Sequence, residues 1–170
     1  MGPEALRVAG IEVVLRKLGR EVVDRGNVAG PVNPWGKPVA GYRHLEETAY
    51  WCRAVRDAYF QALEADELPV LLGGDHALAI GSISAVARYC REQGRPLTVL
   101  WLDAHADFNT PQTTPSGNIH GMPVAVLTGL GPEQLTGLSD ENPAVPSSAF
   151  VQLGIRSVDP VEKSMVLASE

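Results

Sequence analysis

Apolar residues recur three or four positions apart in several segments of the chain, and this spacing predicts helices. The segments are 2–19, 44–66, 76–94, 123–129 and the residues from Pro160 onward. Gly19 and Gly94 follow the last apolar positions of two of these segments, and glycine is a common helix stop. The pattern therefore predicts a chain in which helices form a large part.

Unbroken apolar runs of strand length alternate with these helices. Such runs are typical of strands that are buried on both faces of a sheet. The predicted strands are 21–24, 68–74, 96–103 and 149–156. Alternation of strands and helices indicates an α/β fold with a parallel sheet flanked by helices. We expect one α/β domain over residues 1–170, with polar loops at 27–42 and 104–121.

The composition suits one globular domain and argues against a nucleic-acid partner. The chain has 170 residues, of which 45% are hydrophobic, and this is enough for one core of ordinary size. Its formal net charge is −6, and no run of basic residues occurs. Because phosphate binding requires clustered Lys and Arg, we expect no nucleic-acid partner.

The chain also lacks the patterns of a membrane protein or an exported protein. No stretch reaches the roughly 20 apolar residues that a membrane span needs. The N-terminus "MGPEALRVAG" has no charged region followed by an apolar one, so it predicts no signal peptide. Cys52 and Cys90 fall in predicted helices and are interpreted as reduced thiols. We therefore expect a cytoplasmic protein without a membrane partner.

Metal-binding side chains stand at the carboxyl end of a predicted strand. In "WLDAHADFNTPQTTPSGNIHGMP", residues 101–123, Asp103, His105 and Asp107 occupy every second position. Side chains at i and i+2 of a strand point the same way, so Asp103 and His105 are predicted to share a face. Asp107 joins them if the extended conformation continues. Ligands of open α/β sheets bind at this edge.

A second predicted strand ends in "GGDH" and delivers His76 to the same edge of the sheet. Taken alone, this motif also fits an ordinary helix cap, and the Asp-His-Asp triplet alone also fits a surface loop. Their joint occurrence at two strand ends favours a metal site. Carboxylates and imidazoles suit Mn²⁺, Zn²⁺ or Fe²⁺, and the oxygen majority favours Mn²⁺. Asp103 could bridge two ions, which together can activate water.

At "GGDHALAIGSISA" and "DAHADFNTPQTTPSGNIHGMP" the sequence resembles the ureohydrolases, the arginase–agmatinase family, and within them the arginases. The resemblance implies a three-layer αβα fold and two manganese ions. It places His76, Asp103 and Asp107 on one ion, and Asp103 and His105 on the other. It further implies that a hydroxide bridging the ions attacks the guanidinium carbon of L-arginine, giving urea and L-ornithine. His120 matches the proton-shuttle histidine of the family, and Asp107 belongs to the catalytic centre.

The same resemblance explains the polar loop. It implies that Asn109, Ser116 and Asn118 bind the α-carboxylate of the substrate. Asp159 matches the acid that faces the α-ammonium, and Glu162 assists it. Because agmatine has no carboxylate, this loop favours arginine over agmatine. The sequence departs from the family at Ser157, where an acid is usual.

Parts of the family pattern lie outside this sequence. The first strand with its Gly-rich loop, the second Asp-x-Asp pair and a late glutamate are absent. The resemblance therefore implies an incomplete fold and a partial ligand set. A complete enzyme would be a homo-oligomer, trimeric or hexameric. Two alternatives stay open: another ureohydrolase, such as an agmatinase or guanidino-acid hydrolase, or an inactive truncated fragment that binds metal weakly or serves as an interaction module.

Overall fold

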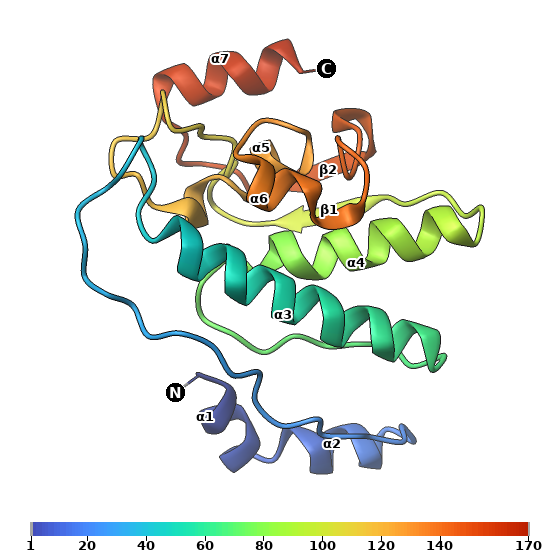
Figure 1. Cartoon of the computed structure of the whole chain (residues 1–170). Coiled ribbons are helices and arrows are strands. Elements are labelled where there is room, and N and C mark those ends of the chain that lie inside the picture. The colour runs from blue at the N-terminus through green and yellow to red at the C-terminus, as the bar shows by residue number, and fades with distance from the viewer. Residues whose placement is uncertain (1, 170) are drawn as a thin grey trace.

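The structure is a computed structural model that describes residues 2–169. Its helices and strands follow one another along the chain as Figure 1 shows. The helices are α1 (Gly2–Val8), α2 (Ile11–Lys17), α3 (Leu45–Glu64), α4 (Leu78–Glu92), α5 (Pro123–Leu127), α6 (Glu133–Thr136) and α7 (Pro160–Ala168). The strands are β1 (Val99–Leu102) and β2 (Phe150–Leu153), and short 3-10 turns are η1 (Ile119–Gly121), η2 (Gly137–Ser139) and η3 (Ser147–Ala149).

The sheet is parallel, incomplete and flanked by helices, as the sequence predicts. β1 pairs with β2 from Val99 opposite Phe150 to Leu102 opposite Leu153. Successive side chains point to opposite faces, and Val99 and Trp101 are buried in the main core. On the other face, the side chains of Leu100, Leu102, Val151 and Leu153 are exposed. One face of the sheet thus carries the core, and the other stays open.

Helices α3 and α4 pack against one another. Residues of α4 and of α7, such as Ala87 and Met165, join the core cluster that contains Val99 and Trp101. Helices α3 and α4 approach closely at Gly81, where a Cβ atom would collide with the backbone of Cys52. Cys52 is buried, Cys90 is half-buried, and both are free thiols, as expected. Burial raises the pKa of Cys52 to about 12, so this thiol stays protonated at neutral pH.

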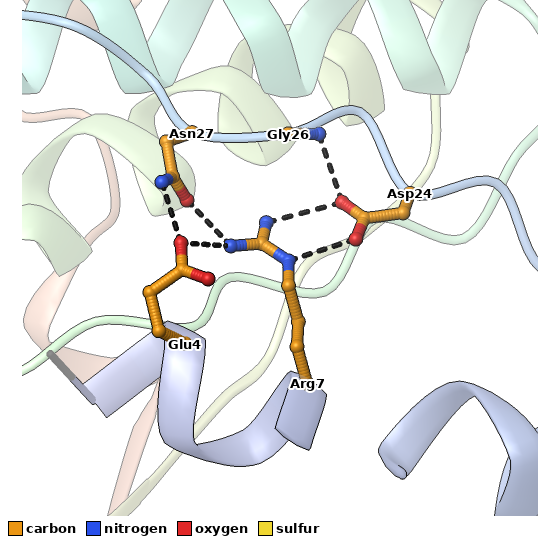
Figure 2. A network of polar contacts seen from close by, with 5 residues as sticks. All are labelled: Glu4, Arg7, Asp24, Gly26 and Asn27. Atoms are coloured by element: carbon orange, nitrogen blue, oxygen red, sulfur yellow. Dashed lines mark hydrogen bonds and ion pairs between the residues drawn. The ribbon is translucent and has the colours of Figure 1, made fainter.

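The predicted helix at 2–19 is divided into α1 and α2. Gly10 has φ of 82°, a left-handed conformation that ends one helix and starts the next. Figure 2 shows how α1 meets the following segment: the guanidinium of Arg7 contacts Glu4, Asp24 and Asn27. Asp24 also accepts a hydrogen bond from the backbone N–H of Gly26. Charged and polar groups therefore join α1 to residues 24–27.

Two predicted strands are wrong. Residues 21–24 and 68–74 form no ladder with any residue of the described chain. The exposed fractions are 90% for Leu68 and 67% for Val70. An apolar run becomes a strand only where another strand supplies hydrogen-bond partners, and residues 2–169 offer none at these positions. Across the same residues, no helix combines the length and apolar character that a membrane crossing requires.

Candidate metal and substrate site

His76, Asp103 and Asp107 bring three potential metal-ligand atoms within 4.8 Å of one another. Nδ1 of His76 lies 2.9 Å from Oδ2 of Asp103 and 2.9 Å from Oδ2 of Asp107. The exposed fraction of the side chain falls from 42% for His76 to 20% for Asp103 and 7% for Asp107. Solvent therefore reaches the cluster beside the imidazole, while Asp107 forms its floor.

The end of β1 and the start of α5 position the two aspartates. The backbone N–H of Asp103 donates to Leu153 in β2, so Asp103 continues the sheet register. Asp107 lies in a left-handed conformation with φ of 50°, and its carbonyl accepts a hydrogen bond from the N–H of Val124 in α5. The extended conformation ends at Leu102. Asp107 joins Asp103 through this turn and not through continued alternation.

The imidazole of His76 contacts one aromatic ring and two carboxylates. This imidazole stacks on the indole of Trp101, with ring centroids 4.3 Å apart and an interplanar angle of 16°. The adjacent Asp107 carboxylate, with a further contribution from Asp103, raises the pKa of His76, although partial burial opposes the shift. Trp101 is a further residue of this site, and it is buried. Its position two residues before Asp103 in a strand is the signal that places both on one face.

Backbone donors hold Asp103 in its ionised form. Partial burial alone would raise the pKa of Asp103. The backbone N–H groups of His105 and Ala104, together with the neighbouring His76, more than offset burial and lower that pKa. One of these donors, the N–H of His105, lies 3.0 Å from Oδ1. Oδ2 stays directed at His76, so the two carboxylate oxygens have separate partners.

The surroundings of the Asp107 carboxylate indicate whether these three residues fit a metal ion. Its Oδ2 is buried and receives no directed hydrogen bond from residues 2–169, although the His76 ring is close. A buried carboxylate oxygen without a donor is costly unless a cation satisfies it. Two carboxylates and an imidazole are donors that Mn²⁺ accepts. The three side chains therefore fit a divalent cation.

His105 and His120, the two further histidines of the predicted site, stand apart from these three side chains. Nδ1 of His105 is 3.5 Å from Oδ1 of Asp103, and 61% of its side chain is exposed. His120 lies in η1, with its Nδ1 3.9 Å from Oδ2 of Asp75. Neither belongs to the group of three converging atoms. Both are exposed and can meet a ligand from solution.

Asn109 and Asp159 meet although one follows β1 and the other precedes α7. Nδ2 of Asn109 donates to Oδ2 of Asp159 over 3.1 Å. Oδ1 of Asn109 accepts a hydrogen bond of 2.9 Å from the hydroxyl of Thr113. The amide is therefore fixed at both ends, with its donor side toward Asp159. Asn109 is buried and Asp159 is exposed, so the pair lies at a surface edge.

Glu162 is buried, and its carboxylate is occupied by the backbone. Oε1 accepts a hydrogen bond of 2.8 Å from the N–H of Phe108, and Oε2 accepts one of 3.1 Å from the N–H of Asp159. Glu162 thus ties α7 to the loop that carries Asp107 and Asn109. The spacing Asp-Pro-x-Glu is a helix-capping signature that the sequence reading did not use. Ser157 is exposed, and its N–H donates to the carbonyl of Ala104.

Ser116 and Asn118 lie on the same polar loop, farther along the chain. The hydroxyl of Ser116 accepts a hydrogen bond of 3.2 Å from the N–H of Asn118. Ser116 is exposed and Asn118 half-buried, so both are accessible to a small ligand. The sequence reading missed Arg43, which donates to the carbonyl of Ser116 from 73 positions away. Because the two residues are so far apart in the sequence, no local sequence pattern predicts this contact.

The chain is similar in sequence to known proteins. The sequence matches the arginase family over residues 1–169. The arginase of Brucella melitensis is 42% identical over 172 residues, covering 100% of this chain and 55% of the relative. The arginase of Agrobacterium fabrum is 42% identical over 168 residues, covering 98% of this chain and 51% of the relative. The chain thus spans about half the length of the curated relatives it matches.

Solved arginase structures share the fold. The arginase of Bacillus caldovelox superimposes with a TM-score of 0.92 at 34% identity, covering 99% of this chain and 56% of that one. The arginase of Entamoeba histolytica, in complex with L-ornithine, gives a TM-score of 0.85 at 33% identity, covering 98% and 55% of the two chains. Because the sequence match and the structural match both extend over nearly all of its residues, this chain belongs to the arginase family.

Proposed function

We propose that this chain carries the metal-binding and amino-acid-binding part of a manganese-dependent arginase, which hydrolyses L-arginine to urea and L-ornithine. The observation that carries the proposal is that ligand atoms of His76, Asp103 and Asp107 converge. Asp107 lies on the loop that also carries Asn109. The names of the relatives support arginine as the substrate. The majority of carboxylate oxygens in the cluster supports manganese.

The metal ligands of the proposal come from the segment before α4 and from the loop after β1. His76, Asp103 and Asp107 hold the first ion, and Asp103 together with His105 holds the second. With two manganese ions bound, these residues would provide a centre that activates water for attack on the guanidinium carbon. The short distance between His76 and both carboxylates supports this assignment. The stacked Trp101 keeps the His76 ring from turning away.

The polar loop recognises the amino-acid end of the substrate. Asn109, Ser116 and Asn118 are neutral donors that suit a carboxylate, and Asp159 suits an ammonium group. The bond between Asn109 and Asp159 supports this division, because it brings a donor and an acid to one place. Glu162 positions Asp159 through its backbone N–H and does not itself meet the substrate. Agmatine lacks the carboxylate and should gain little from this loop.

His120 moves the proton that the reaction requires. Hydrolysis adds water across the bond between the guanidinium carbon and the side-chain nitrogen, and that nitrogen leaves as a neutral amine after taking up a proton. The exposed ring of His120 is the proposed donor of that proton, and Oδ2 of Asp75 lies 3.9 Å from its Nδ1. Imidazole suits the role because its ordinary pKa lies near neutrality. Asp107 belongs to the same centre as the buried ligand.

Urea release tests the proposal. Purified chain with added Mn²⁺ is assayed with L-arginine and, separately, with agmatine, and Asp107→Asn serves as the matched inactive variant. We expect urea from arginine in preference to agmatine, and none from the variant. Release from agmatine alone would exclude an arginase. Absence of urea from both substrates, with Mn²⁺ bound, would favour the inactive metal-binding alternative. In the cell we propose a cytoplasmic location and a homo-oligomeric assembly.

A further inference from the structure

A tight turn brings the segment 38–43 against the polar loop. Val39 and Tyr42 exchange two backbone hydrogen bonds, of 2.7 and 2.9 Å. Between them, Ala40 has φ of 50° and Gly41 has φ of 85°, and two successive left-handed residues define a type I′ turn. Tyr42 packs against the core cluster that also contains Ile119. The turn is therefore anchored in the core and presents the next residue, Arg43, to the loop.

Arg43 donates to two consecutive carbonyls of that loop. Its backbone N–H donates to the carbonyl of Gly117 over 2.8 Å. Its Nε donates to the carbonyl of Ser116 over 3.0 Å. Residues 43 and 118 also form an isolated parallel bridge. One residue thus fixes two successive peptide planes between Ser116 and Asn118.

Side chains of the loop accept hydrogen bonds from the loop's own N–H groups. The carbonyls of Ser116 and Gly117, in contrast, accept theirs from Arg43. Oγ1 of Thr114 accepts from the N–H groups of Ser116 and Gly117, at 3.3 and 3.1 Å. The hydroxyl of Ser116 accepts from the N–H of Asn118. Without the Nε donor of Arg43, the carbonyl of Ser116 loses this hydrogen bond. The peptide between Ser116 and Gly117 can then turn, and its orientation sets where the neighbouring side chains lie.

Close packing adds a steric constraint to these hydrogen bonds. A Cβ atom at Gly41 would lie 2.7 Å from Cβ of Pro111. A Cβ atom at Gly117 would lie 3.2 Å from the carbonyl oxygen of Gly41 and from Cβ of Pro38. The two segments therefore meet with no room for a side chain. Residues 38–43 act as a template for the shape of residues 111–118.

We propose that Arg43 is a positioning residue that sets Ser116 and Asn118 for the α-carboxylate, and so contributes to discrimination between L-arginine and agmatine. The proposal rests on the proposed function for the meaning of the loop. What it adds to the proposed function is that the selectivity of the loop depends on Arg43, a residue outside the loop. Arg43 acts through the two carbonyls that it binds and does not touch the substrate.

Hydrogen exchange tests the structural half in the protein without ligand. The amides of Gly117 and Asn118 are compared in the wild type, Arg43→Ala and Arg20→Ala, an exposed arginine elsewhere on the surface. Arg43→Ala keeps the backbone N–H that binds the Gly117 carbonyl and removes only the Nε donor to the Ser116 carbonyl. It should therefore raise the exchange rate of the Gly117 amide, which shares a peptide with that carbonyl, by about fivefold, the effect of one ordinary hydrogen bond. Arg20→Ala should leave both amides unchanged. Equal exchange in all three proteins would overturn the proposal.

Ligand binding tests the selectivity half. Dissociation constants for L-arginine and agmatine are measured by calorimetry on the metal-free proteins, in which neither ligand is hydrolysed during the titration. Arg43→Ala should weaken arginine binding about fivefold, in line with the loss of one hydrogen bond, and leave agmatine unchanged. Preserved discrimination in this variant would overturn the role of Arg43. If the wild type binds both ligands equally or neither, the carboxylate role fails with the proposed function, and exchange still decides whether Arg43 holds the loop.

Two further variants separate hydrogen bonding and shape from charge. Arg43→Lys keeps the positive charge but cannot place a donor where Nε lies, so it should resemble Arg43→Ala. Full recovery of selectivity in Arg43→Lys would assign the effect to charge and contradict positioning. Gly41→Ala leaves Arg43 intact but introduces the clash with Pro111. It should lower arginine selectivity in the same direction, and unchanged selectivity would contradict the template role.

Discussion

The side-chain amide of Asn109 donates to the carboxylate of Asp159 over 3.1 Å, although 50 positions separate the two residues. In the proposed complex these groups face the two α-substituents of one amino acid. A carboxylate attracts the amide donor, and an ammonium attracts the acid. The bond between them therefore occupies the place where the substrate's own pair of charges would lie.

Asn109→Ala should weaken the use of arginine far more than that of agmatine. A hydrogen bond to a charged group contributes about 1.5–3 kcal/mol, so we expect KM for arginine to rise by roughly tenfold or more. KM for agmatine should change little. Steady-state urea assays measure both constants, with Gln112→Ala, an exposed residue of the same loop, as the control. A parallel rise for the two substrates would show that Asn109 does not read the carboxylate.

Asp107→Asn should remove most of the affinity for Mn²⁺. The substitution keeps the size of the side chain but replaces a charged, buried ligand oxygen by a neutral amide group. Even outer-shell changes weaken metal sites by about 10–100-fold, so a loss of at least tenfold is expected. Elemental analysis after dialysis and calorimetric titration measure it. His120→Ala should keep the metal, and full metal retention by Asp107→Asn would remove that residue from the site.

Manganese affinity and metal-free stability should respond oppositely to pH. The pKa of His76 is raised above its ordinary 6.5 by the neighbouring carboxylates. Without metal, the protonated ring stabilises the fold fully below pH 6.5, and this contribution is lost as pH rises through the raised pKa. Metal binding requires the deprotonated ring, so affinity rises through the same window.

Denaturation and Mn²⁺ titration at successive pH values above 6.5 check these two slopes. His76→Ala should abolish the metal-free slope in that window and flatten the affinity profile. Slopes of the same sign in the wild-type protein would show that the ring of His76 does not govern either quantity.

Glu162→Ala should destabilise the fold by roughly 2–4 kcal/mol, because it leaves two backbone N–H groups without acceptors. Those groups belong to Phe108 and Asp159. Chemical denaturation measures the free energy of unfolding, and Glu133→Ala, an exposed glutamate in α6, is the control. An effect no larger than that of the control would mean that the buried carboxylate is not a structural anchor.

Gly81→Ala should destabilise the fold although alanine favours helices. Helix propensity alone would stabilise the variant by up to about 1 kcal/mol. The added methyl group meets the backbone of Cys52 in α3, and overpacking of this kind costs about 1–3 kcal/mol. The thermal midpoint of unfolding should therefore fall. Ser82→Ala on the next position of α4 is the matched control, and a rise of the midpoint in Gly81→Ala would contradict the close helix contact.

The sequence predicted the elements whose partners lie in residues 2–169. The run at 96–103 became β1 and the run at 149–156 became β2, because the two runs pair with one another. The run at 68–74 has equal apolar character but no ladder partner within the described chain. Periodicity reports which side chains can be buried, whereas a strand also needs a neighbour. The split at Gly10 was missed because the apolar spacing continues across it.

The candidate site was predictable from the apolar runs that precede its residues, although only the run before Asp103 forms a strand in the described chain. His76 and Asp103 follow two apolar runs, and the structure brings them within 2.9 Å. Asp107 reaches them through a left-handed turn, which alternation does not predict. The anchoring of Glu162 could have been read from its capping spacing. The contact of Arg43 with the loop could not, because it depends on how a distant turn packs.

The charge network around Arg7 predicts that ionic strength affects how firmly α1 and α2 are attached to the rest of the chain. Neither α1 nor α2 has a buried residue in the described structure, so polar contacts such as those of Arg7 with Asp24 and of Arg25 with Glu67 bear much of the attachment. Exposed ion pairs weaken as added salt shortens the screening length. Segments with few apolar contacts also open first. The N-terminal helices should therefore become open to proteases in concentrated salt while α3 and α4 remain folded.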